Sequence, residues 1–181
     1  MDSAKKTLRR RYRRERAERF TIESWMHILD CKELINAKCV ASYISYSYEP
    51  GTEDINSAII ESGRTLLIPR TLSDNDLAWV QWRGDVNSLK KSGNILEPNG
   101  PAWNDLATID VMILPALHID STGNRLGQGG GSYDRASTKI HAWKIGLVHH
   151  GELSSELLPI QDHDQRLNAA ATPDVIVRFK N

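Results

Sequence analysis

The chain has 181 residues, of which 40% are hydrophobic and 25% are charged, and 23 Lys and Arg balance 23 Asp and Glu. This length and composition are typical of a globular domain with its own core, and no apolar run is long enough to cross a bilayer. Because the first residues lack the apolar core of a secretory signal and Cys31 and Cys39 have no metal-ligand spacing, we expect a cytoplasmic protein with reduced thiols.

Basic residues are concentrated at the start of the chain. Residues 1–20 contain nine Lys and Arg but three Asp and Glu. Residues 5–19 contain neither Gly nor Pro and predict a helix, on which Lys5 and Arg9 share one face. Three roles are open for this helix: a solvated cationic face, a nucleic-acid-binding arm, or a pair of cations that points at an anion bound elsewhere. No aromatic platform or nucleic-acid-binding motif accompanies it, which disfavours the second role.

Helices and strands alternate in the next part of the chain. The spacing of Trp25, Ile28 and Leu29 predicts a helix over residues 22–34 that Thr21 caps. Buried strands are expected at residues 39–45 and 65–69, with a helix from Thr52 to Gly63 between them. This order predicts a right-handed crossover and a parallel sheet. In such a sheet ligands bind beyond the carboxyl ends of strands, where Glu49 and Arg70 lie.

The second half continues the same pattern. Residues 77–82 predict an antiparallel or edge strand, and residues 83–107 are rich in loop-forming residues. Further strands are expected at residues 111–114, 144–148 and 174–178, with a helix over residues 133–142. Pro173 restricts residues 168–174 to a sheet edge or a loop. We therefore expect an α/β fold: a single compact, monomeric domain with a mostly parallel central sheet flanked by helices.

A glycine-rich stretch follows the strand at residues 111–114. Four of the eight residues from Gly127 to Asp134 are glycine, and Arg125 and Arg135 bracket them. Glycine permits positive φ and close approach of the backbone to a ligand, and consecutive free N–H groups bind anions. Arginine adds bidentate phosphate contacts, and a carboxylate beside phosphates suits Mg²⁺. The stretch predicts a nucleotide or polyanion site, although it has neither a P-loop lysine nor a dinucleotide fingerprint.

Arg125-Leu-Gly-Gln-Gly-Gly-Gly-Ser-Tyr-Asp-Arg135 resembles the signature R-L-G-x-G-x-G-Y-Y-D-R of the 5-formyltetrahydrofolate cyclo-ligase family. Further segments similar to that family occur in the expected order: Lys5-x-x-Leu8-Arg9, Glu49-x-x-Thr52, Leu67–Arg70, Ile95–Pro98, Asp110–Pro115 and His163-Asp164. The ordered match spans nearly the whole chain, so it is more specific than any one motif.

The resemblance implies an ATP- and Mg²⁺-dependent ligase of one-carbon metabolism. Such an enzyme converts 5-formyltetrahydrofolate into 5,10-methenyltetrahydrofolate and releases ADP and phosphate, so small molecules are its partners. The implied ATP-binding residues are Lys5, Arg9, Arg125, Leu126, Gly127, Gln128, Gly129, Gly130, Gly131, Ser132 and Tyr133. The implied folate-binding residues are Ile44, Glu49, Gln128, Gly129, Gly130, Gly131 and Ser132. Asp134 and Asp164 are the implied Mg²⁺ ligands. No nucleophile is implied, because phosphoryl transfer depends on positioning and charge neutralisation, to which Arg125 contributes.

Two departures from the family pattern are visible. Ser132 occupies the position of the first tyrosine of the signature, and the stretch at residues 168–174 differs from the usual C-terminal strand, near Asp164. Two alternatives follow. One is an ATP-binding relative within the family that has another substrate or has lost turnover. The other, more distant, is a nucleic-acid-binding module that uses the arginine-rich helix.

Overall fold

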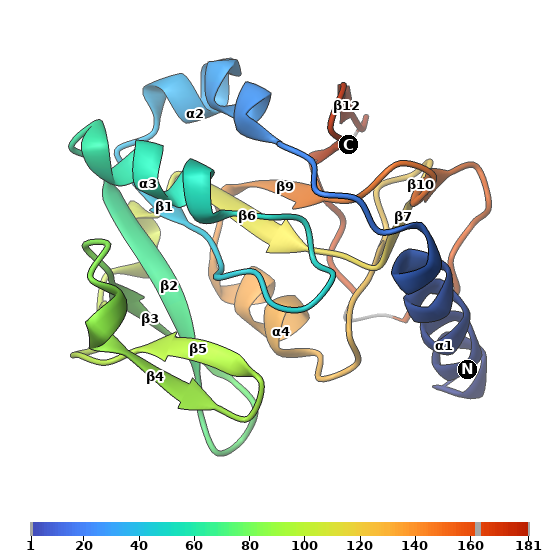
Figure 1. The fold of residues 1–181 in the computed structure, drawn as a ribbon, viewed down its shortest axis with the longest axis horizontal. Helices are drawn as coiled ribbons and strands as arrows, with labels where there is room; N and C mark the ends of the chain where they lie inside the picture. Colours follow the sequence, from blue (N-terminus) through green and yellow to red (C-terminus); the bar gives the residue numbers. More distant parts are fainter. Residues whose placement is uncertain (1, 162–163, 181) are drawn as a thin grey trace.

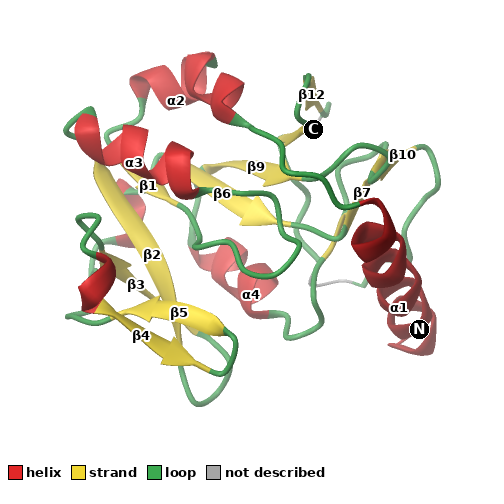
Figure 2. Ribbon diagram, in the orientation of Figure 1, coloured by secondary structure: helices red, strands yellow, loops and turns green. Residues whose placement is uncertain are grey.

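The computed structural model describes residues 2–161 and 164–180, and in these residues a seven-stranded sheet lies between helices (Figure 1, Figure 2). In spatial order its strands are β12 (Ile176–Arg178), β11 (Ala169–Ala171), β9 (Trp143–Leu147), β6 (Val111–Pro115), β1 (Cys39–Ala41), β2 (Thr65–Thr71) and β3 (Leu77–Gln81). The five inner strands are parallel, and the two edge strands are antiparallel to their neighbours. The predicted fold class is confirmed.

Hydrophobic side chains fill both faces of this sheet, because a parallel strand is covered on each side. Along β6, Val111 and Ile113 point to one core cluster, and Met112 and Leu114 point to the other. Helices α2 (Lys32–Asn36) and α3 (Glu53–Glu61) cover the first face, and α4 (Ser132–Lys139) covers the second, as Figure 1 shows.

The continuous helix expected over residues 22–34 is wrong. Residues 20–25 are non-helical and are followed by a 3₁₀ helix, η1 (Met26–Asp30), and then by α2 after a break at Cys31. Thr21 caps neither helix. Trp25 and Ile28 are nonetheless buried as expected. The indole N–H of Trp25 donates to the Val148 carbonyl (3.1 Å), so tertiary contact fixes the chain here against its local helix propensity.

The first strand is shorter than the expected residues 39–45. It ends at Ala41, because the carbonyl of Tyr43 accepts hydrogen bonds from Thr52 Oγ1 and Asn56 Nδ2 (2.9 Å for the latter) instead of pairing in the sheet. Thr52 precedes α3 as expected, but its hydroxyl is used in this contact and caps no helix N–H. Gly63 follows α3 with φ +78° and ends it as predicted.

The C-terminal stretch lies inside the sheet, which corrects the expected edge or loop at residues 168–174. Strand β11 is buried between β9 and β12, and Pro173 falls in the turn after it. Residues 83–107 are also more ordered than expected. They contain short 3₁₀ helices η2 (Val86–Ser88) and η3 (Leu106–Thr108), and a hairpin of β4 (Leu89–Ser92) and β5 (Ile95–Pro98).

The predicted basic helix is present as α1 (Asp2–Arg19), and it packs beside a small second sheet. That sheet contains β7 (His118–Asp120), β8 (Arg125–Leu126) and β10 (Leu153–Ser154). The Tyr12 ring stacks on His118 with centroids 4.1 Å apart, and it joins a small cluster with Leu117, Leu126 and Leu158. These contacts place one face of α1 against the loops that follow β6. No described helix combines the length and apolar character needed to cross a membrane.

Candidate active site

A cavity of about 360 Å³ opens at the carboxyl ends of the parallel strands, where the topology predicts a ligand site. Its walls come from the segments after β1 and β6, from the end of β2, from the hairpin, from α1 and from the glycine-rich stretch. All the predicted site residues line it: Lys5, Arg9, Ile44, Glu49, Arg125, Leu126, Gly127, Gln128, Gly129, Gly130, Gly131, Ser132, Tyr133, Asp134 and Asp164. His163, the other half of the predicted late pair, lies outside the described residues.

The glycine loop, residues 127–131, depends on glycine for its shape. Gly129 has φ +120° and Gly131, which precedes α4, has φ +66°. A Cβ atom on Gly127 would lie 2.8 Å from an Arg125 guanidinium nitrogen, so a larger residue there would displace that guanidinium group. Within the described part of the chain, the N–H groups from Gly127 to Asp134 donate to no protein acceptor. Together with the N-terminus of α4, they are available to an anion.

Three cations surround this loop. The Nε of Arg9 donates to the Gly127 carbonyl (3.0 Å). The guanidinium of Arg125 donates to Pro115 O (3.0 Å) and pairs with Asp134 (2.8 Å). Lys5 reaches the cavity from the first turns of α1. Two cations from the first helix therefore line the same cavity as the loop, which lies more than one hundred residues later in the chain, and this favours the third of the roles considered for that helix.

Asp134 and Asp164 both face the cavity, and each is close to a cation. Asp134 pairs with Arg125, and Asp164 pairs with Lys5 (2.5 Å). No group of three His, Cys, Asp or Glu side chains with metal-site geometry occurs in the described residues. Mg²⁺ usually takes one or two protein carboxylates and completes its shell with phosphate oxygens and water, so this donor set fits a nucleotide-bound Mg²⁺.

The opposite wall of the cavity carries a buried carboxylate. Glu49 is only 8% exposed, and burial raises its pKa to about 7 against the opposing effects of Tyr46 N–H, Arg16 and Gln128. The half-buried Ile44 lies on the same wall. Burial and the nearby Glu49 raise the pKa of Tyr133, whose hydroxyl therefore stays protonated. This wall offers an apolar surface with a carboxylate and a phenol donor.

Several lining or supporting residues were not predicted. Glu97 is buried on the hairpin, lines the cavity and accepts a hydrogen bond from Thr71 N (2.9 Å). Its motif, residues 95–98, was visible in the sequence. Arg13 donates to Gln128 through its Nε (2.9 Å), and its position one turn after Arg9 was a usable signal. Gln161 accepts from Lys5 (3.3 Å), and nothing in the sequence indicated that contact.

The cysteines are poor nucleophiles. Burial raises the pKa of Cys31, and it raises the pKa of Cys39 to about 11. Both cysteines are free of a disulfide in the structure, and both are buried. Arg70 donates to the Gly100 carbonyl (2.8 Å) and thus anchors the end of β2.

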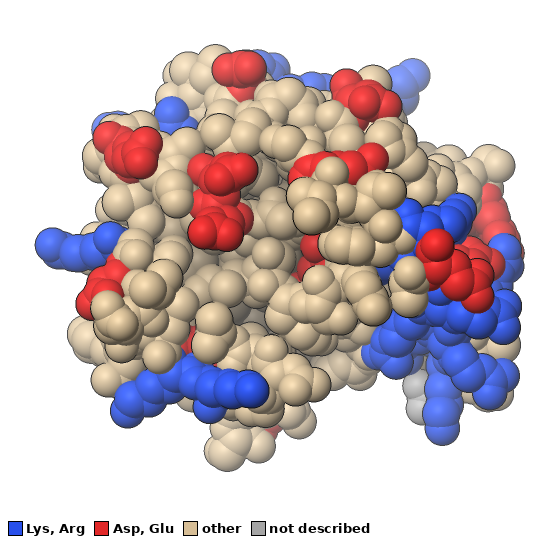
Figure 3. Space-filling model, viewed as in Figure 1, with Lys and Arg blue, Asp and Glu red and all other residues tan. Residues whose placement is uncertain are grey.

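The remaining cations of α1 gather on one side of the molecule (Figure 3). Most are already engaged: Arg16 forms a buried pair with Glu152 (2.6 Å), and Arg11 and Arg19 pair with Glu15 on the surface. Together with the contacts of Lys5 and Arg9, these ion pairs explain most of the positive charge of α1 by contacts within the protein. They give no support to a nucleic-acid partner.

Residues 4–173 match the model of the 5-formyltetrahydrofolate cyclo-ligase family. The chain belongs to this family. It is 32% identical over 149 residues to a 5-formyltetrahydrofolate cyclo-ligase of Mycolicibacterium smegmatis, covering 77% of this chain and 75% of that protein. It is 27% identical over 150 residues to the Escherichia coli 5-formyltetrahydrofolate cyclo-ligase, covering 79% of this chain and 82% of that protein. A ligase is therefore indicated by both the family and the named relatives.

Solved structures support the fold. The Aquifex aeolicus 5,10-methenyltetrahydrofolate synthetase superposes with a TM-score of 0.81 over 98% of this chain and 93% of that chain, at 22% identity. The 5,10-methenyltetrahydrofolate synthetase of Mycoplasma pneumoniae superposes with a TM-score of 0.69 over 92% of this chain and 96% of that chain, at 17% identity. The described architecture is the one shared by these synthetases.

Proposed function

We propose that the protein is an ATP- and Mg²⁺-dependent 5-formyltetrahydrofolate cyclo-ligase that forms 5,10-methenyltetrahydrofolate, ADP and phosphate. One observation supports this most strongly. A single cavity joins an anion-binding wall, made of the glycine loop and three cations, to an apolar wall that contains a buried carboxylate. A reaction between ATP and a reduced folate requires these two kinds of surface side by side.

The anion-binding wall suits the ATP phosphates. The free N–H groups of the glycine loop, the N-terminus of α4 and the guanidinium groups of Arg9 and Arg125 converge there. Lys5 adds a third charge. Arg125 is well placed to neutralise charge on the transferred phosphoryl group, since its side chain is 4% exposed and its guanidinium group contacts Asp134 and the Pro115 carbonyl.

The apolar wall suits the pterin ring. Ile44 packs against the ring, and Glu49 accepts hydrogen bonds from ring N–H groups, while the segment Gln128–Ser132 borders both substrates. Glu49 lines the same cavity as the glycine loop, and burial strengthens its hydrogen bonds.

The chemistry follows from this arrangement. The formyl oxygen attacks the γ-phosphorus of ATP, ADP leaves, and the formamide becomes an iminium phosphate. N10 of the folate then attacks the formyl carbon and loses its proton, and phosphate leaves with the former formyl oxygen. Both steps require alignment and neutralisation of phosphate charge, so the protein needs no nucleophile of its own.

Asp134 and Asp164 are the residues that would hold Mg²⁺. The ion would neutralise charge on the β- and γ-phosphates. Arg125 and Lys5, which pair with these carboxylates in the protein alone, would then turn toward the phosphate oxygens.

The test is a spectrophotometric cyclisation assay. Purified protein with ATP, Mg²⁺ and 5-formyltetrahydrofolate should produce the near-ultraviolet absorbance of the methenyl product, with one ADP released per product. Asp134→Ala should lose this activity while retaining its fold by circular dichroism. Absence of product at saturating ATP and Mg²⁺ would refute the proposal.

A second candidate rests on Ser132. This residue lines the cavity at the position where the family pattern has tyrosine. The side chain that borders the substrate is therefore changed, while the residues of the anion-binding wall are all present. The candidate is an ATP-binding relative with another substrate or without turnover. This candidate is supported if the wild type binds ATP but forms no methenyl product and Ser132→Tyr behaves in the same way. Formation of the methenyl product by the wild type excludes it. Under both candidates we expect a single-domain monomer located in the cytoplasm. Sedimentation tests the oligomeric state, and cell fractionation tests the location.

A further inference from the structure

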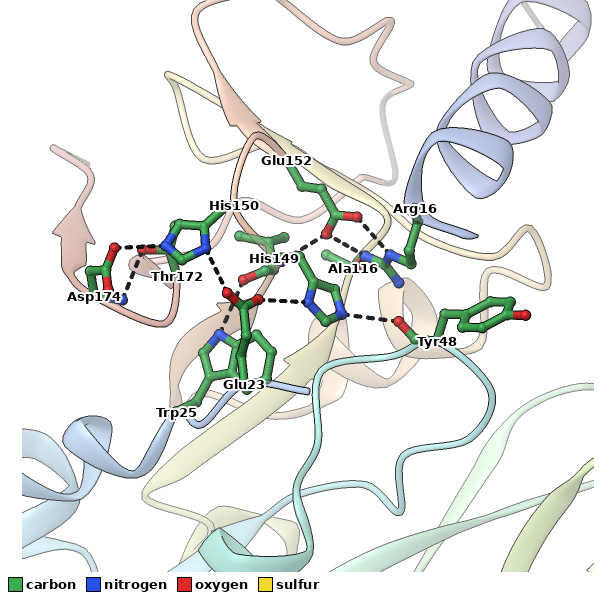
Figure 4. Close-up of polar contacts among 11 residues, drawn as sticks. Arg16, Glu23, Trp25, Tyr48, Ala116, His149, His150, Glu152, Thr172 and Asp174 are labelled. Atoms are coloured by element: carbon green, nitrogen blue, oxygen red, sulfur yellow. Dashed lines mark hydrogen bonds and ion pairs between the residues drawn. The ribbon is translucent and has the colours of Figure 1, made fainter. Parts of the chain in front are cut away.

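Two adjacent histidines, His149 and His150, lie where segments distant in the sequence meet, among them α1 and the turn before Glu49 (Figure 4). His149 is buried, and His150 is half-exposed. The carboxylate of Glu23 bridges them: one oxygen lies 3.2 Å from His149 Nδ1 and the other 2.8 Å from His150 Nδ1. The two rings differ in what they contact next. His150 Nε2 faces Asp174 (2.6 Å), whereas His149 Nε2 faces the backbone carbonyl of Tyr48 (3.0 Å).

The Tyr48 carbonyl is directly before Glu49. On the other side of Glu49, the Tyr43 hydroxyl donates to the Pro50 carbonyl (3.0 Å). The two carbonyls that flank the carboxylate are therefore each held by a buried side-chain donor. The turn that leads into Glu49 needs such support. It is closed by the Glu49 N–H, which donates to the Tyr46 carbonyl (3.2 Å), and within it Ser47 adopts φ +53°, which is unfavourable for a residue other than glycine.

The position of His149 is itself fixed by buried contacts. Its backbone N–H donates to Glu152 Oε2 (2.8 Å), and Glu152 is paired with Arg16 of α1. Its ring packs edge-on against Trp25 and Phe20, with centroids 5.0 and 5.6 Å away. Figure 4 shows the ring directed from this junction toward Tyr48. The ring is thus a rigid link between the interior and the turn that carries Glu49.

We propose that His149 is a positioning residue that, by donating to the Tyr48 carbonyl, holds the Glu49 carboxylate against the reduced folate. This inference rests on the proposed function. Glu23 orients the ring by binding its other nitrogen. The Tyr48 carbonyl is an acceptor, so the ring nitrogen that faces it, Nε2, carries a proton in this contact. The charged side chain that contacts the ring is Glu23, whose carboxylate also contacts His150. Glu152 contacts the backbone N–H of His149 and is paired with Arg16.

His149→Phe is the variant that tests this role. Phenylalanine retains the aromatic contacts with Trp25 and Phe20 but has no donor. The KM for 5-formyltetrahydrofolate should rise roughly three- to tenfold, which corresponds to one lost hydrogen bond. The KM for ATP and kcat should change little, because the anion-binding wall is made by the glycine loop and the first turns of α1.

His150→Phe is the matched control, since it removes the adjacent ring that shares Glu23 but does not contact Tyr48. Its kinetic constants should equal those of the wild type. His149→Gln, whose amide can still donate to Tyr48, should recover much of the loss. Nitrogen NMR of the His149 ring should show a proton on Nε2, the nitrogen that faces the Tyr48 carbonyl.

The results distinguish failure of the proposed cyclo-ligase function from failure of the role assigned to His149. Wild-type protein without cyclisation refutes the function and this inference with it. Active wild type with an unchanged folate KM in His149→Phe refutes the inference alone. A parallel rise of both KM values, or a loss of kcat that His149→Gln does not recover, would show a general structural role and would also overturn it.

Discussion

At the scale of single residues, the protonation state of Glu49 links pH to folate binding. Burial raises its pKa to about 7, so the carboxylate is ionised only above that value. If it accepts hydrogen bonds from ring N–H groups, the KM for 5-formyltetrahydrofolate should fall as pH rises through 7, and this fall should disappear in Glu49→Gln. Steady-state kinetics at several pH values with saturating ATP measure this. The same pH dependence in the variant would assign the titration to another group.

The same residue should affect stability. The pKa of Glu49 rises from 4.5 to about 7 on folding, so the folded state binds the proton more tightly and stability falls as pH rises from 4.5 to 7. This corresponds to roughly 3 kcal/mol. Relative to the wild type, Glu49→Gln should therefore gain stability over that range, as measured by urea unfolding at its two ends. A constant difference between the two proteins would contradict the buried ionisation.

Ser132 is the residue at which this chain departs from its family. It is half-buried at the start of α4, beside Tyr133. Ser132→Tyr should add an aromatic ring to the apolar wall of the cavity. The KM for the folate should then fall roughly two- to tenfold, which corresponds to the free energy of one aromatic contact. The KM for ATP should not change. An altered ATP KM with an unaltered folate KM would instead place Ser132 at the nucleotide.

At the scale of elements, the position of α1 depends on the Arg16–Glu152 pair. Both side chains are 4% exposed, and Arg16 also donates to the Ala116 carbonyl. Arg16→Met should cost about 3–5 kcal/mol of unfolding free energy, because it leaves Glu152 buried without its cation. Arg16→Met combined with Glu152→Gln should cost less. Chemical denaturation measures both.

The exposed pair Arg178–Glu33 supplies the comparison. It has two short hydrogen bonds, 2.6 and 2.8 Å, but the Arg178 side chain is 46% exposed. Arg178→Met should cost less than about 1 kcal/mol. Equal costs for the two arginines would mean that burial of the Arg16 pair is not what ties α1 to the protein.

The elements that the sequence predicted are those whose pattern is local. The basic helix has continuous helix formers, and β6 is a buried apolar run. Residues 22–25 were mispredicted as helix because Trp25 is fixed by a hydrogen bond to Val148, far along the chain. β11 was misplaced because three alanines carry little strand signal and Pro173 was assigned to the strand instead of the turn after it.

The predicted site residues all line one cavity, and their roles in binding remain predictions. They could be selected from the sequence because they fall in short motifs that resemble those of one family. Glu152, which contacts both Arg16 and the backbone of His149, gave no signal, since a single glutamate in a turn does not reveal a buried arginine 136 residues earlier. Positioning contacts of this kind depend on the assembled structure and leave no pattern in sequence.

At the scale of the whole molecule, the anion-binding side of the cavity contains residues from both the first and the last part of the chain. Lys5 and Arg9 come from the first helix, and Asp164 and Gln161 come from the segment before β11. The apolar cluster around Tyr12 holds the middle of α1, whereas its first turns are held largely by these polar contacts. A ligand that binds only the assembled site stabilises that assembly.

A nonhydrolysable ATP analogue with Mg²⁺ should therefore slow amide hydrogen exchange in the first half of α1 and around Gln161, as well as in the glycine loop. Strands β1 and β2 are already buried, so their exchange should not change. Lys5→Gln should weaken the protection, whereas Arg10→Gln, which alters an exposed side chain of the same helix, should not. Protection confined to the glycine loop would mean that ATP is bound without the first helix. The cations of α1 would then have to act at a later step, when phosphate charge moves toward the folate.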